Sequence, residues 1–394
     1  MSWTLPPEGL NLLLSGLQEA QLALRALLHA LGLAPDLHGQ PAWPFAHRLA
    51  REMLALDAGH ARRVVGMLAC GLLAVLLLAL SLPWRRARRG LWGLALVVLL
   101  LAPWPEARVL WAPAVPTSLH TSPAGFTAQG IVRGQAVYQQ FCVSCHGADG
   151  RGEGPRAASL PMWPPTLNGA LLWKRLDGEL FWRVRHGLRA RDGSVTMPGF
   201  ERLGDAQIWD VLDFLQANAA GQMLKAAGAW AHPVRLPDAL VQCRTGRDHT
   251  VRSLTGQRLR VALAGPDTRL ADDPRLKTLE VRVPSRTVAG SDPECRMDGP
   301  EVATALALVL GVPPDQLQAQ QLLVDRGGWL RARSQPGQAG WSEDDLVCTT
   351  PNAARPSPAK SPAVDGLETL IRRIDAEPVR LLRGGFPHAG RASG

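Results

Sequence analysis

The most apolar stretch of the chain covers residues 64–82 and carries no charged side chain over 19 positions. A helix needs about 20 apolar residues to cross the hydrocarbon core of a bilayer, so this stretch predicts a transmembrane helix. A second apolar run at 91–105 is shorter, with Trp92 and Trp104 near its ends. Tryptophans at such positions are typical of a membrane interface. Extended by its neighbours, this run predicts a return span at about 91–108.

Residues 10–33 also reach spanning length, but they carry a polar stripe at helical spacing, made of Gln18, Gln21, Arg25 and His29. Two interpretations stay open for this segment. It is either an amphipathic helix that lies on the membrane or packs in a bundle, or a third transmembrane helix. With either interpretation, residues 1–111 form a membrane-anchoring region.

The loop between the two predicted spans contains four arginines, Arg85, Arg86, Arg88 and Arg89. Positively charged loops stay on the cytoplasmic side of a membrane. The chain beyond about residue 106 is then expected on the opposite side. The pattern predicts a protein of the inner (cytoplasmic) membrane of a bacterium, with its C-terminal domains facing the periplasm.

The predicted anchor is followed by four regions that differ in composition. Residues 112–126 are rich in Pro, Ser, Thr and Ala and are expected to form a linker. A domain is expected at 127–222 and another, of α/β type, at 236–350. Residues 351–394 have the composition of a flexible tail that contains one short amphipathic helix.

The segment "CVSCH" places two residues between Cys142 and Cys145, with His146 directly after the second thiol. This spacing lets two thiols reach the two vinyl groups of haem while the imidazole reaches the iron, and it is the signature of c-type haem attachment. Zinc would need further ligands at a set spacing, and none lies nearby in the sequence. A thioredoxin-type pair follows a strand, whereas this pair ends a helical stretch. The motif therefore predicts one covalently attached haem c.

The sixth ligand of the iron is expected to be a thioether or an imidazole from downstream. Met197, in "SVTMPGF", lies 51 residues after His146, and the proline and glycine that follow it form a rigid turn able to present the sulfur. Met162 and His186 are the competing ligands. Alternatively, Met197 only fills space in the core, as most methionines do. We expect His146 and Met197 to be the axial ligands.

The residues around this motif carry a family resemblance. A short helical pattern precedes "CVSCH", a loop rich in glycine and proline follows it, and "PPTL", "MPGF" and "IWDVLDFL" come next in order. In these features residues 127–220 resemble a class I c-type cytochrome domain. The resemblance implies an all-α fold, thioether bonds at Cys142 and Cys145, and His146 and Met197 as proximal and distal iron ligands. A carbonyl of Pro164 or Pro165 is the expected hydrogen-bond acceptor for the His146 ring.

The wider stretch from "PTSLHTSPAGF" to "DGELFWRVRHG" is similar to the cytochrome module appended to some bacterial copper-resistance D-type membrane proteins. Those proteins contain a larger helical bundle, whereas this chain has two or three predicted spans. Copper transport is therefore not expected of this chain alone.

The region from 236 to 350 alternates strand and helix patterns. Strands are expected at 258–264 and 278–284, a helix at 300–312, and a hairpin at 322–333. The hairpin "LLVDRGGWLRAR" resembles the closing hairpin of redoxin and thioredoxin-like domains, which implies an α/β thioredoxin-like domain. The sequence "GPDTRL" stands where such domains carry their cysteine pair, so the domain is expected to be degenerate.

The three remaining cysteines outside the apolar run, Cys243, Cys295 and Cys348, are expected to provide one structural disulfide and one free thiol in an oxidising compartment. Alternatively, Cys295 with Met297 and His249 would bind copper as soft ligands, although nothing in their spacing demands it.

The formal charge of +9 comes mainly from arginine. No basic run is interleaved with aromatic residues, so nucleic-acid binding is not expected. Between residues 151 and 191, basic side chains outnumber acidic ones: Arg151, Arg156, Lys174, Arg175, Arg183, Arg185, Arg189 and Arg191 face Glu153, Asp177 and Glu179. A positive rim of this kind would steer an acidic redox partner. An ordinary solvated surface is the alternative.

Taken together, the sequence predicts a multidomain protein with N-terminal transmembrane helices, an all-α class I cytochrome c domain and a C-terminal thioredoxin-like domain. The expected function is one-electron transfer by a membrane-anchored periplasmic cytochrome, that is, a carrier rather than an enzyme. Two alternatives stay open: a copper-handling or redox-assembly factor whose redoxin-like region binds metal or a partner, and a haem enzyme with a labile sixth ligand.

Overall fold

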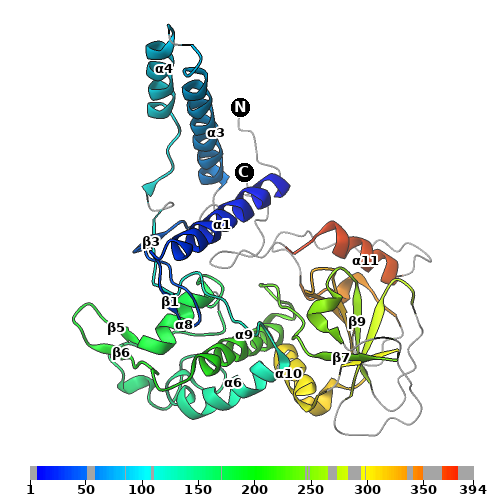
Figure 1. Cartoon of the computed structure of the whole chain (residues 1–394). Coiled ribbons are helices and arrows are strands. Elements are labelled where there is room, and N and C mark those ends of the chain that lie inside the picture. Colours follow the sequence, from blue (N-terminus) through cyan, green and yellow to red (C-terminus); the bar gives the residue numbers. More distant parts are fainter. Residues whose placement is uncertain are drawn as a thin grey trace. The chain divides into compact units, whose positions relative to one another are not determined.

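The longest apolar run folds into helix α3 (Ala58–Leu80) in the computed structural model of the chain (Figure 1). Among the described residues, Gly59–Leu80 is the one helix long and apolar enough to cross a membrane. Helix α4 (Arg88–Leu100) packs against α3 through Ala74, Leu77 and Ala95. It is shorter than the predicted return span, since prolines at 103 and 105 follow it and cannot continue a helix. The second span stays a prediction.

The structure describes residues 7–50, 58–84, 86–107, 111–169, 171–244, 246, 249–264, 273–282, 294–297, 299–334, 340–348 and 366–379. Predictions that lie wholly or partly outside these residues include the end of the return span at 108, the "GPDTRL" loop at 265–270, and most of the tail at 351–394. The chain divides into two units, with the boundary between Pro116 and Thr117.

In its described residues, the first unit contains, besides α3 and α4, one further long helix and two short strand pairs. Helix α1 (Pro7–Ala30) covers most of the segment with the polar stripe. The strands are β1 (Asp36–Leu37) with β2 (Gln40–Pro41), and β3 (His47–Arg48) with β4 (Ala112–Pro113), both antiparallel.

The segment predicted as a linker, 112–126, is not a free tether. Thr117, Ser118 and His120 are buried, and the Thr117 hydroxyl donates to the carbonyl of Gly178 over 2.6 Å. Polar residues of this kind suggest a loop from composition alone, but here they are packed against helix α8 (Asp177–His186). Only residues 112–116 lie before the unit boundary.

The haem-signature region folds into helices, as expected. They are α6 (Ala128–Phe141), the short α7 (Val143–His146), α8, and the long α9 (Asp205–Ala227), with a small antiparallel pair, β5 (Leu188–Arg189) and β6 (Val195–Met197), between the last two. Helices α6 and α9 lie side by side (Figure 1). A Cβ atom on Gly134 would collide with the carbonyl oxygen of Asp210. Glycine is therefore what allows the two backbones to approach here.

Seven strands form one mixed sheet in the order β13-β12-β9-β10-β11-β7-β8. Their bounds are Leu240–Cys243 (β7), His249–Thr250 (β8), Leu259–Ala264 (β9), Lys277–Arg282 (β10), Cys295–Met297 (β11), Gln321–Val324 (β12) and Leu330–Arg333 (β13). The predicted strands correspond to β9 and β10, and the predicted hairpin to β12 and β13, so these predictions are confirmed. Strand β10 is parallel to both β9 and β11, and the other neighbours are antiparallel. Residues 283 and 284 of the second predicted strand lie outside the description.

Two helices complete the sheet region. Helix α10 (Pro300–Leu310) begins on a proline and ends at Gly311 in the left-handed conformation, as is usual for helix ends. Helix α11 (Gly366–Ala376) buries Leu370 and Ile374 in an apolar cluster with strand residues such as Leu323.

The cytochrome-like helices and the sheet, predicted as separate domains at 127–222 and 236–350, share one apolar core. Ile131 of α6 and Leu224 of α9 belong to the same buried cluster as Val261 of β9 and Leu306 of α10. Figure 1 shows α10 next to α6 and α9. Both regions therefore belong to the single unit from Thr117 to Leu381.

Candidate haem site

The two thiols of the haem signature lie where one helix ends and a single helical turn begins. Cys142 ends α6, its N–H donating to the carbonyl of Tyr138 over 2.9 Å, and the N–H of His146 donates to the carbonyl of Cys142 over 2.9 Å. Residues three and four apart lie on one side of a helix, so Cys142, Cys145 and His146 face a common side. Both thiols are free in the structure.

The His146 ring is suited to ligate a metal in its neutral form. Burial lowers the pKa of His146, and the backbone of Pro165 acts weakly in the opposite direction. The Nδ1 atom is buried and makes no hydrogen bond. A buried polar atom without a partner is costly, and iron ligation at Nε2 would orient Nδ1 as a donor to a nearby carbonyl. The expected Pro165 contact has support here; the bond itself is not formed.

The loop after His146 folds back over the motif. Gly152 N–H donates to the carbonyl of His146 over 2.8 Å, and Gly154 N–H donates to that of Cys145 over 3.1 Å. Gly152 has a φ of +87°, and a Cβ atom on Gly154 would lie 2.5 Å from the carbonyl oxygen of Ser144. Glycines are thus required for the loop to approach the motif so closely.

Tyr138 is a site residue that sequence reasoning missed. It is almost fully buried, its hydroxyl donates to the carbonyl of Gly147 over 2.7 Å, and its ring lies 5.0 Å from that of Phe214. It is the one tyrosine of the chain, four residues before Cys142. That isolated occurrence is the only sequence signal that marks it. Its role is to join α6, α9 and the start of the loop.

Two asparagines hold the loop in the same way. Asn168 and Asn218 both donate from Nδ2 to the carbonyl of Asp149, over 2.7 and 3.1 Å. Asn218 lies on the buried side of α9, where an amide is unusual and indicates a hydrogen-bonding task. Nothing in its spacing identified its partner.

Met197 ends strand β6 and is half-buried. Its backbone packs so closely against the end of α8 that a Cβ atom on Gly187 would collide with the carbonyl oxygen of Met197, and one on Gly199 would lie 2.8 Å from that of Arg185. The turn after Met197 is therefore closely packed against the end of α8. Its role as an iron ligand stays a prediction.

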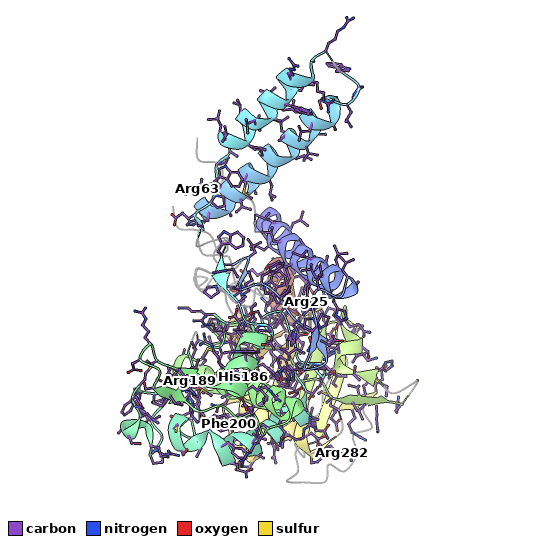
Figure 2. The ribbon with its side chains drawn as sticks, turned by 60° about the vertical axis from the view of Figure 1, so that its left-hand side comes forward. Arg25, Arg63, His186, Arg189, Phe200 and Arg282 are labelled. Carbon is purple, nitrogen blue, oxygen red and sulfur yellow. A yellow bond between two sulfur atoms is a disulfide. The ribbon has the colours of Figure 1, made fainter. Side chains whose placement is uncertain are left out.

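The two competing ligands are differently placed. The Met162 side chain is exposed. The His186 ring contacts that of Trp182 in a tilted arrangement, with 4.0 Å between the ring centroids, and lies 3.6 Å from the Glu201 carboxylate. Figure 2 labels His186 beside Arg189 and Phe200, in the region that carries Met197. The His186 ring is therefore already in contact with Trp182 and Glu201.

Most of the basic side chains counted between 151 and 191 are exposed: Arg151, Arg156, Lys174, Arg175, Arg189 and Arg191. Arg185 is instead half-buried and pairs with Asp205 over 2.8 Å. Burial, aided by Arg175, lowers the pKa of Arg183. Six of the eight basic residues are therefore exposed, and the positive rim itself stays a prediction.

The cysteines of the sheet form one disulfide, Cys243–Cys295, between β7 and β11, and leave Cys348 as a buried free thiol. The prediction of one bridge and one thiol is confirmed. Burial raises the pKa of Cys348 to about 11. Because Cys295 is oxidised, it offers no thiolate to copper, and no cluster of three or more His, Cys, Asp or Glu suited to a metal occurs in the described part of the chain.

A comparison with known families matches the part of the chain that contains this site. The family described as cytochrome C oxidase, cbb3-type, subunit III matches residues 129–215, which contain the thiols, His146 and Met197. The chain contains a c-type cytochrome domain. Such a domain implies covalently bound haem c, and the free thiols, the neutral imidazole with its unbonded Nδ1 and the glycine loop all fit that group.

A solved structure from Kuenenia stuttgartiensis, a reducing HAO-like protein complex, is similar at 23% identity over 32% of this chain and 59% of that chain, with a TM-score of 0.22. The match thus spans less than two thirds of that chain. No curated protein matches this one.

Proposed function

We propose that this protein is a membrane-anchored, periplasm-facing cytochrome with one haem c that carries one electron at a time. The observation that carries the proposal is the haem-signature turn at α7, with two free thiols and a half-buried His146 whose pKa is lowered by burial and whose buried Nδ1 makes no hydrogen bond. The haem supplies the one-electron iron couple.

Each residue of the site has a role in this proposal. Cys142 and Cys145 would form thioether bonds to the vinyl groups, and His146 would bind the iron through Nε2. Nδ1 of His146 would then donate to the Pro165 carbonyl, which would fix the ring and raise its basicity. Met197 would provide the sixth ligand from the turn that follows β6.

Ligation by His146 and Met197 favours electron transfer over haem catalysis. A thioether ligand raises the reduction potential, and two axial ligands leave no open position for a substrate. The close backbone packing of the Met197 turn against the end of α8 supports this assignment.

Membrane anchoring is supported by α3, which has the length and composition of a membrane-spanning helix. A return span through α4 would place the arginine loop in the cytoplasm and the cytochrome domain in the periplasm. The cytochrome domain itself agrees with that side, where covalent haem and disulfides such as Cys243–Cys295 persist.

We propose in addition that the sheet region is a degenerate thioredoxin-like domain. Its central part supports this, because β9 lies between the parallel β10 and the antiparallel β12, and β13 closes the hairpin. This is the arrangement that the resemblance of the closing hairpin implies. Its disulfide joins neighbouring strands, so it is a structural bridge in this proposal.

The test is expression of the full chain with a c-type haem maturation system, followed by acid-acetone extraction of washed membranes. We expect a c-type α band to survive extraction in the wild type and in a Cys348→Ser control. The Cys142→Ser, Cys145→Ser double variant is expected to lose all of it. Haem that is extracted from the wild-type protein would refute covalent attachment, and a wild-type band in the soluble fraction would refute anchoring.

The six exposed basic residues support an acidic redox partner. Small inorganic oxidants of opposite charge test this without knowing that partner. Oxidation of the reduced protein by ferricyanide, an anion, is expected to slow as ionic strength rises, whereas oxidation by a cationic cobalt complex is expected to quicken. An Arg175→Glu, Arg191→Glu variant is expected to reduce both trends, and Lys225→Glu serves as its control. Salt effects of equal sign for the two oxidants would contradict the proposal.

A further inference from the structure

Helix α1 turns its polar stripe inwards. The Nδ1 atom of His29 lies 3.0 Å from the carbonyl of Ala34, and the side-chain oxygen of Gln21 accepts a hydrogen bond from Leu49 N–H over 3.0 Å. The Nε atom of Arg25 is buried. The polar groups that made this segment ambiguous in the sequence thus face the rest of their own unit.

The opposite side of the helix is apolar and exposed. A helix turns by about 100° per residue, so Leu27 lies about 180° from Gln18 and nearly opposite Arg25. Leu12, Leu24, Leu27 and Leu31 are 76%, 41%, 56% and 62% exposed. We define the outward face of α1 as these leucines with Ala20 and Ala23, which are also exposed. Glu19 lies at its edge, about 80° from Leu27.

This polarity is the reverse of that of a helix on a water-soluble protein, whose polar side faces solvent. A row of leucines in water is unfavourable, by roughly 25 cal/mol for each Å² of apolar surface left exposed. An apolar solvent removes that cost. Helix α3, in the same unit, shows the same kind of surface, with Leu72 and Val75 62% and 61% exposed, and has the length of a membrane span.

We infer that the outward face of α1 contacts the acyl chains of the bilayer that α3 crosses. The inference rests on the proposed membrane anchoring and extends it, since it assigns a second lipid-facing surface to a helix whose hydropathy does not qualify it as a span. The inward polar stripe would then attach α1 to the protein, while its leucines enter the lipid.

Spin labelling of the full chain in nanodiscs of phosphatidylethanolamine and phosphatidylglycerol tests this contact. In a Cys70→Ala, Cys348→Ser background, single cysteines are placed at Leu24, Leu27 and Leu31. Leu72→Cys on α3 is the lipid reference, and Lys225→Cys, exposed on α9, is the water reference. The measured quantity is the ratio of collision rates with oxygen, which concentrates in lipid, and with a water-soluble nickel complex.

Labels on the outward face are expected to show the same ratio of oxygen to nickel collision rates as the label at Leu72. That ratio should be several-fold higher than the ratio at Lys225. A water-like ratio at Leu24, Leu27 and Leu31 would overturn the inference. Low collision rates with both reagents, together with dipolar broadening that disappears on dilution with unlabelled chain, would also overturn it and indicate a second copy as the occupant. A water-like ratio at Leu72 would be a separate failure, that of the proposed anchoring by α3.

Discussion

At the scale of single residues, burial sets the reactivity of the haem signature. Burial, with the neighbouring Cys145, raises the pKa of Cys142 to about 12. Thiol chemistry proceeds through the thiolate, so the Cys142 thiol itself is a weak nucleophile at neutral pH. The same kind of burial lowers the pKa of His146.

Met197 is the residue on which the predicted potential depends. Met197→His is expected to keep covalent haem but to lose the far-red absorbance of thioether ligation and to lower the reduction potential, because imidazole favours the ferric state more than a thioether does. Spectroelectrochemical titration measures both changes. Met162→Leu is the control and should match the wild type. Equal effects of the two substitutions would exclude Met197 as the ligand.

Asp213 offers a prediction of pH dependence. Burial, and then the carboxylate of Asp210, raise the pKa of Asp213 well above its ordinary value. Its contribution to stability is therefore complete below the unfolded pKa of about 3.9 and is lost as the pH rises through the folded value. At pH 7, Asp213→Asn should raise the free energy of unfolding by on the order of 1 kcal/mol.

Urea unfolding of the haem-loaded protein at pH 4 and pH 8 measures this effect. The stabilisation by Asp213→Asn should shrink towards the lower pH, where Asp213 is protonated. Asp213→Ala is the comparison, because it cannot accept the hydrogen bond from the Thr127 backbone. A gain of the same size at both values would show that charge is not the cause.

At the scale of elements, the crossing of α6 and α9 determines the shape of the cytochrome domain. The crossing is held by the Arg133–Asp210 pair, with two contacts of 2.7 and 3.0 Å, and by the close approach at Gly134. The haem signature follows directly from the end of α6. Any change in the crossing therefore moves Cys142 relative to the Met197 turn.

Gly134→Ala tests the close approach. An added methyl group would collide with the Asp210 carbonyl, so the helices must separate, and we expect a loss of about 1–3 kcal/mol. The higher helix propensity of alanine, about 1 kcal/mol, offsets only part of this loss. The melting temperature of the haem-loaded protein should fall, while Gly169→Ala, where space is open, should leave it nearly unchanged. A stabilised Gly134→Ala variant would contradict the packing described here.

The elements also show what the sequence was able to predict. Periodicity found four strands of the sheet (β9, β10, β12 and β13), α10 and helices on both sides of "CVSCH", because each has an apolar pattern; it did not find β7, β8 or β11. It failed where tertiary contacts decide: Thr117 and His120 look like linker residues but are buried against α8. It also extended the second span past Leu100, although Pro103 and Pro105 end the helix.

At the scale of the whole molecule, the shared core joins the haem-binding helices to the sheet. Gly221 of α9 and Gly311 after α10 approach so closely that a Cβ atom on either would collide with the other backbone. No local pattern marks such a contact, since the two glycines lie 90 positions apart in the chain. The sequence therefore suggested two domains where the structure has one folding unit from Thr117 to Leu381.

The disulfide provides a test of this unity. Cys243 and Cys295 are 52 positions apart, and closing a loop of that length stabilises a protein by about 4 kcal/mol in the loop-entropy estimate. Replacing both by alanine is expected to lower the melting temperature. Because the core is shared, the haem absorbance and the far-ultraviolet circular dichroism should shift together. A haem transition that stays at the wild-type temperature while the sheet melts earlier would refute a common unit.

The contact of α10 with α6 and α9 limits how freely this cytochrome can be exchanged between proteins. Small haem domains are often regarded as cassettes that evolution or a protein engineer inserts intact into new surroundings. A haem domain cut from this chain before Trp230 would expose an apolar surface, because Ile131, Ala217 and Leu224 would no longer be buried by α10 and the sheet. Descendants of this protein are therefore expected to inherit or lose the two parts as a pair.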